Sequence, residues 1–329
     1  MRQIYITVLV IVINTVFISL CAISTAQERS ARENLRKGES LYQAQDYKQA
    51  IEQFRAALDI FQSDKADSKK YVKELKQILE RLYFSNRKLN NYQETIEYGT
   101  AYLNLDPENE AIVRDIAQIY TFRQQNINNA LKIWKDYDKK YNSIVAKQEI
   151  AELYSRLNNI PEAVKWFNAA LEINNDVGVL HKMANMYINH RDTHRAFALF
   201  EDFLASNPPD KDKGRAYRSM GIFFQDLKNN HKALENYELA LRYDYDRSIT
   251  LWLVTQYFDS NQFNYALRHI ANMQQRNPND PEAAYFKGLI LYRQADYTQA
   301  FDEFKKVEND AEYGRVAKEH IDRITKRKY

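Results

Sequence analysis

The sequence predicts an all-α protein, an α-solenoid in which pairs of antiparallel helices stack one after another along the chain. Three observations predict it. Only seven glycines and six prolines occur in 329 residues, so few residues interrupt helices. A pattern of small and aromatic residues returns about every 34 residues. Prolines collect where one copy of the pattern ends and the next begins, because proline cannot continue a helix.

The register of the repeats follows from one small residue expected early in the second helix of each pair. This residue falls at Ala50, Thr95, Ala130, Ala163, Ala196, Ala233, Ala266 and Ala300, at intervals of 45, 35, 33, 33, 37, 33 and 34 residues. Only the first interval contains a long insertion, near residues 62–75, and it reads as an extension of a helix. The series predicts eight helix pairs.

Each recurring residue has a role in packing. Two antiparallel helices approach closely only where small side chains meet, as Gly38 would meet Ala50 and Gly221 would meet Ala233. An aromatic residue follows one helical turn later and should fill the space against the next pair. The aromatic positions are Phe54, Trp134, Phe167, Phe200, Tyr237 and Phe304. Neighbouring pairs would then bury one elongated core.

The pattern resembles the tetratricopeptide repeat, with its period of 34 residues. The clearest copy reads Gly38-x2-Leu41, Asp46-Tyr47, Ala50, Phe54 and Ala57, and the resemblance covers about residues 31–307. It implies a right-handed superhelix of about eight helix-turn-helix repeats. The second repeat departs from the pattern at Thr95 and Gly99, and the third has a one-residue insertion before Ala130.

The two ends of the chain lie outside the repeats. Residues 308–329 predict a C-terminal capping helix with a basic tail, since Tyr313, Ala317, Ile321 and Ile324 share one helical face. At the other end, Arg2 precedes an apolar run from Ile4 to Ile23. Residues 1–26 are therefore expected to be a signal peptide or an N-terminal membrane anchor, and the solenoid is expected to occupy residues 27–307.

Three fates remain open for this N-terminal segment. Ser24-Thr25-Ala26 offers small residues for signal-peptidase cleavage after Ala26. The apolar run is also long enough to span a bilayer as an uncleaved anchor. Cys21, the one cysteine of the chain, follows Ile18-Ser19-Leu20, which resembles a lipidation motif except for the large Leu20. Each fate predicts an exported protein, periplasmic or attached to the bacterial envelope through its N-terminus, unless the anchor inserts in the opposite orientation.

Composition and motifs favour a protein without catalysis. The formal net charge is +3 and no basic cluster of the kind that binds nucleic acid stands out. No glycine-rich phosphate loop or paired cysteine motif occurs, and subtraction of the repeats leaves no room for a catalytic domain. His190 and His194 flank an expected turn, so their spacing does not indicate a metal site. We expect no metal, no cofactor, no small-molecule substrate and no nucleic-acid partner.

The resemblance also implies where a partner binds. In this family the first helix of each repeat lines the concave groove, through its second, fifth, ninth and twelfth positions. Applied to repeats five to eight, this rule gives the candidate partner-binding residues His181, Asn185, Arg215, Arg218, Phe258, Tyr285 and Tyr292. The two arginines would meet an acidic group and the aromatic residues would hold apolar side chains of a peptide or helix.

The predicted function is therefore a protein-protein interaction scaffold or adaptor in the bacterial cell envelope. Two alternatives remain: a lipoprotein involved in outer-membrane protein assembly, which requires lipidation at Cys21, and a surface-exposed or secreted adhesin.

Overall fold

The computed structural model describes residues 25–63 and 70–327 of the chain. Cys21 and the predicted export segment up to residue 24 lie outside the described residues, as do part of the insertion, residues 64–69, and the end of the basic tail. The predicted cleavage position after Ala26 falls inside a helix that is described from residue 25 to 43.

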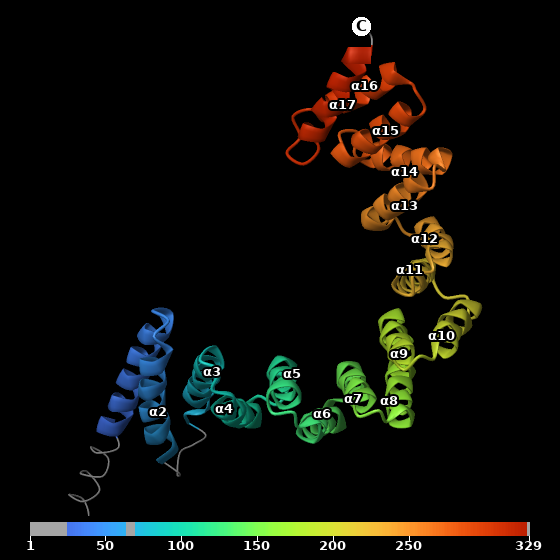
Figure 1. Cartoon of the computed structure of the whole chain (residues 1–329). Coiled ribbons are helices and arrows are strands. Elements are labelled where there is room, and N and C mark those ends of the chain that lie inside the picture. Colours follow the sequence, from blue (N-terminus) through green and yellow to red (C-terminus); the bar gives the residue numbers. More distant parts are fainter. Residues whose placement is uncertain (1–24, 64–69, 328–329) are drawn as a thin grey trace, which may run out of the picture. The chain divides into compact units, whose positions relative to one another are not determined.

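The described chain consists of helices that pack in eight consecutive pairs, followed by one more helix (Figure 1). The all-α solenoid predicted from the sequence is confirmed. The first pair is formed by residues 25–43 and α2 (Tyr47–Ser63). The next pairs are α3 (Val72–Lys88) with α4 (Tyr92–Leu105), α5 (Glu110–Gln118) and η1 (Ile119–Arg123) with α6 (Ile127–Tyr141), and α7 (Ile144–Arg156) with α8 (Ile160–Ile173). The last four are α9 (Val177–Asn189) with α10 (Thr193–Ala205), α11 (Asp210–Asp226) with α12 (Asn230–Tyr243), α13 (Arg247–Asp259) with α14 (Phe263–Arg276), and α15 (Pro281–Arg293) with α16 (Tyr297–Lys306).

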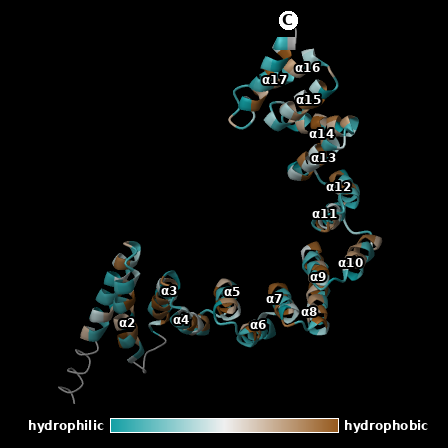
Figure 2. Ribbon diagram, viewed as in Figure 1, coloured by the Kyte–Doolittle hydropathy of each residue, from teal (hydrophilic) through white to brown (hydrophobic). Residues whose placement is uncertain are grey.

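Contacts divide the chain into two compact units, Met1–Asn174 and Asn175–Tyr329. The first holds repeats one to four and the second holds repeats five to eight with α17 (Gly314–Arg327). In both units apolar and polar residues alternate around the helices, as expected for helices that are covered on one side (Figure 2).

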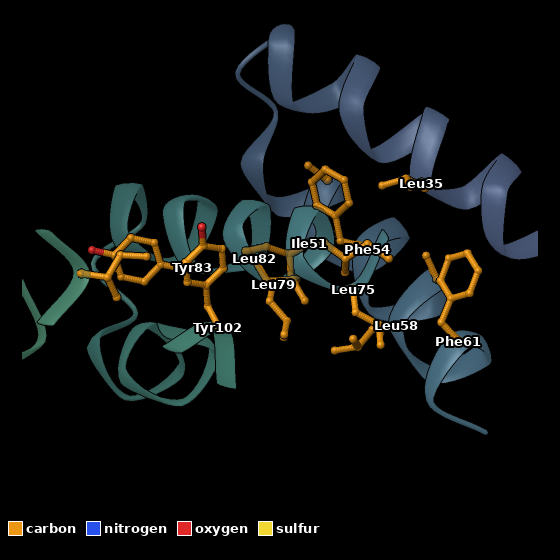
Figure 3. Packing of buried hydrophobic residues seen from close by; sticks show 14 of the residues in the cluster. Leu35, Ile51, Phe54, Leu58, Phe61, Leu75, Leu79, Leu82, Tyr83 and Tyr102 are labelled. Atoms are coloured by element: carbon orange, nitrogen blue, oxygen red, sulfur yellow. The ribbon is translucent and has the colours of Figure 1, made fainter. Parts of the chain in front are cut away.

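The predicted register is confirmed by burial. All eight small residues of the series, Ala50, Thr95, Ala130, Ala163, Ala196, Ala233, Ala266 and Ala300, have an exposed fraction of 0%. The aromatic residue one turn later is also buried, as for Phe54 and Trp134, and each such ring contributes about 1.5–3 kcal/mol of burial free energy. In the first unit, Phe54 of α2, Leu82 of α3 and Tyr102 of α4 belong to one cluster (Figure 3).

The extra residue of the third repeat is accommodated as a single π-helical turn, η1. The amide of Gln124 donates to the carbonyl of Ile119 at 3.0 Å, so the additional residue is absorbed without loss of that backbone hydrogen bond. The small residue Ala130 consequently keeps its buried place in α6.

Helix α17 covers the end of the second unit. Its residues Ala317, Ile321 and Ile324 are buried in one cluster with Phe304 of α16, and Tyr313 packs against the same cluster. This is the apolar face predicted for a capping helix. Among the residues described, no helix combines the length and the apolar character that crossing a membrane requires.

Candidate functional site

The arginines expected to bind an acidic group, Arg215 and Arg218, lie on α11, where each is already ion-paired. Arg215 donates from Nη1 to Asp176 of the preceding repeat at 3.2 Å and to Asp212 at 3.1 Å. Arg218 pairs with Asp246 of the following repeat at 2.9 Å. Burial alone would lower the pKa of Arg215, but the hydrogen bonds to both aspartates raise it above its ordinary value.

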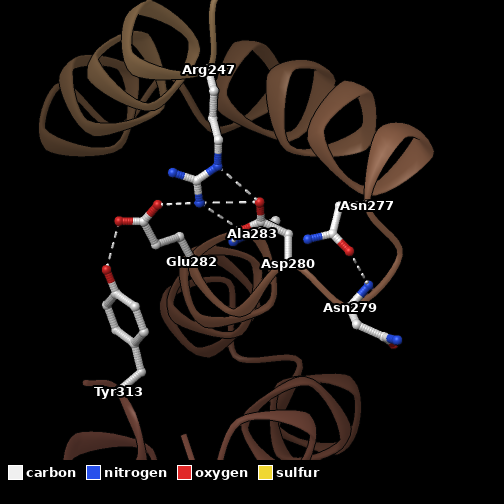
Figure 4. Close-up of polar contacts among 7 residues, drawn as sticks. All are labelled: Arg247, Asn277, Asn279, Asp280, Glu282, Ala283 and Tyr313. Carbon is white, nitrogen blue, oxygen red and sulfur yellow. Dashed lines mark hydrogen bonds and ion pairs between the residues drawn. The ribbon is translucent and has the colours of Figure 1, made fainter. Parts of the chain in front are cut away.

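These carboxylates also cap helices, so each pair joins two repeats at a helix N-terminus. Asp176 accepts from the amide of Gly178 and Asp246 from the amide of Ile249. A third joint follows the same scheme: Arg247 of α13 pairs with Asp280, the N-cap of α15, and with Glu282 (Figure 4). The arginines therefore stabilise the stacking of repeats as well as presenting partly exposed guanidinium groups.

The two polar candidates on α9 differ in exposure. His181 is half-buried and stacks on Phe223 of α11, with ring centroids 4.6 Å apart. Burial lowers the pKa of His181. Asn185 is exposed on the same helix. Asn185 is thus accessible to a partner, whereas the ring of His181 mainly joins α9 to α11.

Phe258 belongs to the core rather than to an accessible surface. It is 8% exposed and lies between Phe263 and Phe286, with the guanidinium of Arg293 4.2 Å from its ring centroid. The expectation that a partner side chain seats on Phe258 does not fit this burial. The spacing rule selected Phe258 because spacing alone does not show that Phe286 of the following repeat packs against this ring.

Tyr285 and Tyr292 share helix α15 and face the end cap. The ring of Tyr285 lies 4.9 Å from that of Tyr313, and Tyr292 lies 5.2 Å from His320 of α17. Both tyrosines are half-buried and pack against the cluster that contains Ile321. The capping segment therefore occupies the place that a further repeat would take and covers much of both rings.

A line of accessible side chains remains on the first helices of repeats five to seven. We define the first-helix face by Asn185 and Ile188 of α9, Arg218 and Ile222 of α11, and Leu251 of α13. Asn185 and Arg218 are exposed and the three apolar residues are half-buried. The helices are neighbours, since His181 stacks on Phe223 and Arg218 pairs with Asp246. This face combines apolar, amide and cationic groups within the second unit.

The structure also exposes an aromatic residue that sequence analysis did not select. Phe122 lies in the π-helical turn and is 58% exposed. The guanidinium of Arg156 lies 5.0 Å from its ring centroid. The one-residue insertion before Ala130 was the available signal, because π-turns in helices often occur at functional positions.

Other titratable groups of the described chain form structural networks. Glu238 accepts hydrogen bonds from Tyr257 at 2.8 Å and Arg268 at 2.7 Å, and lies 2.8 Å from Nε2 of His269. These contacts join α12 to the next repeat. No group of three or more histidine, cysteine, aspartate or glutamate side chains within residues 25–63 and 70–327 could hold a metal ion.

Two sequence models of the tetratricopeptide repeat match the chain, at residues 145–177 and 253–313. No curated protein matches it. Similar solved structures include a tetratricopeptide repeat protein from Parabacteroides merdae, at 18% identity over 77% of this chain and 99% of that one, with a TM-score of 0.38. YrrB, a repeat protein with an unusual peptide-binding site, is 17% identical over 56% of this chain and 97% of its own, with a TM-score of 0.38. The type IV pilus biogenesis factor PilW is 16% identical over 65% of this chain and 97% of its own, with a TM-score of 0.37.

Proposed function

Since this chain is a tetratricopeptide repeat protein, we propose that it is a non-catalytic scaffold that binds a segment of another protein. Repeats of this family generally act as interaction scaffolds. The observation that carries the proposal is the first-helix face of the second unit. There Ile188, Ile222 and Leu251 are partly accessible beside the exposed groups of Asn185 and Arg218.

The chemistry of this face suits a peptide or an amphipathic helix. The apolar side chains can receive the apolar side of the partner, and the amide of Asn185 can pair with its backbone. Arg218 is 54% exposed while it pairs with Asp246, so a partner carboxylate can reach its remaining N–H groups. Arg215 is 42% exposed and offers the same possibility one turn away.

Substitution on matched helices tests the proposal. Ile222→Glu places a carboxylate on the first-helix face, and Leu239→Glu places one at a half-buried position of the second helix α12. Tagged chains isolated from cells after chemical crosslinking should lose their crosslinked partner with Ile222→Glu and retain it with Leu239→Glu. If both variants retain the crosslinked partner equally, the first-helix face is not the binding surface.

We also propose that the scaffold works outside the cytoplasm, in the bacterial envelope. The support is the apolar run from Ile4 to Ile23 with small residues before Gln27. The mass of the N-terminal peptide of the purified protein separates the three fates. A peptide beginning at Gln27 indicates cleavage, a lipid on Cys21 indicates a lipoprotein, and an intact Met1 peptide indicates an anchor. A chain that is recovered from the cytosol with its apolar run from Ile4 to Ile23 still attached would contradict export.

A further inference from the structure

Three successive turns of the first unit carry cations and no carboxylate. We define the basic turn edge as residues 87–93, 121–128 and 155–161, which connect the two helices of repeats two, three and four. They contain Arg87, Lys88, Arg123 and Arg156, and neither aspartate nor glutamate. The corresponding turns of the other five repeats each contain an aspartate: Asp46, Asp192, Asp226, Asp259 and Asp296. Within these bounds, the charge of this edge differs from that of the other five turns inside repeats, although Glu94 and Glu162 follow directly after two of the ranges.

The three turns form one continuous surface. The guanidinium of Arg123 lies 5.4 Å from the ring centroid of Tyr92 in the preceding turn. Gln124 donates from Nε2 to Oε1 of Gln93 at 3.3 Å. Arg156 in turn lies over the ring of Phe122. Each turn thus contacts the next, and all of them belong to the first unit.

Most of these cations have no carboxylate partner. Arg87 pairs with Asp115 at 2.9 Å. Lys88, Arg123 and Arg156 are exposed, and none of the three forms an ion pair within the described part of the chain. Arg123 lies over the ring of Tyr92 and Arg156 over the ring of Phe122, and both side chains remain exposed. An arginine held in this way is suited to a bidentate bond with a carboxylate.

Apolar groups lie between the cations. The π-helical turn places Phe122 at 58% exposure, and Leu157 in the next turn is 44% exposed. An aromatic ring exposed beside unpaired arginines is characteristic of the central residues of protein interfaces. The exposed ring is a local feature of the third repeat, because only that repeat contains the extra residue.

We propose that the basic turn edge binds an acidic segment of a partner protein, with an apolar side chain seated between Phe122 and Leu157. Carboxylates flanking that side chain pair with Arg123 and Arg156. The unpaired cations of the turns favour this occupant, although Glu149 and Glu152 of α7 line the same hollow as Phe122 and Arg156, so the partner carboxylates must approach from the turn side. An anionic membrane is bound by clusters of four to eight flexible basic residues, whereas this edge offers three unpaired cations, two of them arginines held over rings. The surface is separate from the first-helix face of the second unit, so each proposal can fail without the other.

A defined probe tests this inference on the full-length protein in mild detergent. The probe is a fluorescein-labelled peptide of alternating aspartate, phenylalanine and leucine, and the comparison peptide replaces every aspartate by lysine. Fluorescence anisotropy should show binding of the acidic peptide and no binding of the basic one. The double variant Arg123→Glu, Arg156→Glu should bind the acidic peptide about tenfold or more weakly. Phe122→Ala should weaken it about threefold to tenfold through loss of the apolar contact.

The matched control is Lys318→Glu with Lys326→Glu, which makes the same change of charge on exposed positions of α17. It should leave binding unchanged. Thermal unfolding of all variants should coincide with the wild type, since the altered side chains are exposed. Equal affinity for both peptides, or an unaffected Arg123→Glu, Arg156→Glu variant, overturns the inference. So does a result in which that variant loses binding to phosphatidylglycerol vesicles or a dT oligonucleotide but keeps the acidic peptide.

Discussion

The ring of Tyr83 occupies the space that a side chain at Gly99 would need. A Cβ built on Gly99 would lie 3.0 Å from Cδ2 of Tyr83 and 2.9 Å from Cδ1 of Ile116. In repeats one, six and eight the sizes are reversed, because Gly38, Gly221 and Gly288 lie on the first helix against an aromatic ring of the second. In repeat two the large and small residues are therefore exchanged between the two helices.

This exchange predicts strong coupling between Tyr83 and Gly99. Gly99→Phe, which restores the usual aromatic position, should destabilise the first unit by about 1–3 kcal/mol or more through overpacking. The double variant Tyr83→Gly, Gly99→Phe should recover part of that loss, although the hydrogen bond from Tyr83 to Asp115 at 2.7 Å disappears. Urea unfolding of the four proteins of this cycle measures the coupling. Additive effects would show that the two residues do not share one space.

The arginines that form ion pairs between repeats should differ in how much stability is lost when each is replaced by alanine. Arg247→Ala should cost about 1–2 kcal/mol, because it leaves the buried N-cap Asp280, 4% exposed, without its cation. Arg218→Ala should cost about 0–1 kcal/mol, because its side chain is 54% exposed and its partner Asp246 can be solvated. Denaturant midpoints compare the two variants directly. A larger loss for Arg218→Ala would contradict the assigned roles.

Acid should weaken the second unit through His320. Its ring stacks on Phe304 with centroids 4.7 Å apart, and Nδ1 is buried without a hydrogen-bond partner. Burial, reinforced by Arg323 and opposed by Glu319, lowers the pKa of His320. The unfolded chain binds the proton first as the pH falls below about 6.5, so stability decreases from there toward the lower folded pKa.

His320→Phe keeps the stacked ring and removes the titrating group. The difference in unfolding midpoint between pH 7.5 and pH 5.5 should shrink in this variant. Some acid sensitivity should remain from His181, whose pKa burial also lowers. If the variant is as sensitive to acid as the wild type, His320 is not a source of the acid sensitivity.

The sequence predicted most of the fold because close helix crossings tolerate few side chains. Eight small residues read from spacing alone proved fully buried, and the one-residue insertion became the π-turn of Ile119–Arg123. The exchange in repeat two was also visible in the sequence, since Tyr83 stands where a small residue is expected. Gly99 alone does not indicate this exchange, because only Tyr83 shows where the large residue has moved.

The candidate site was harder to predict because exposure depends on the neighbouring repeat. Spacing placed Arg215 and Arg218 on the first helix of repeat six, where α11 holds them, yet it did not indicate their partners Asp176 and Asp246 in other repeats. Spacing likewise could not reveal that α17 covers Tyr285 and Tyr292. The exposure of Phe122 depends on the geometry of the π-turn, which spacing does not show.

The scaffold proposal is tested most directly by site-specific photo-crosslinking in living cells. A photoreactive residue replaces Asn185 on the first-helix face or, as a control, Asn264, which is also exposed, on the second helix α14. The account predicts a discrete protein adduct from position 185 that disappears when Ile222→Glu is added, and no such adduct from position 264. The same adduct from both positions, or an adduct at 185 that survives Ile222→Glu, would contradict binding at the first-helix face.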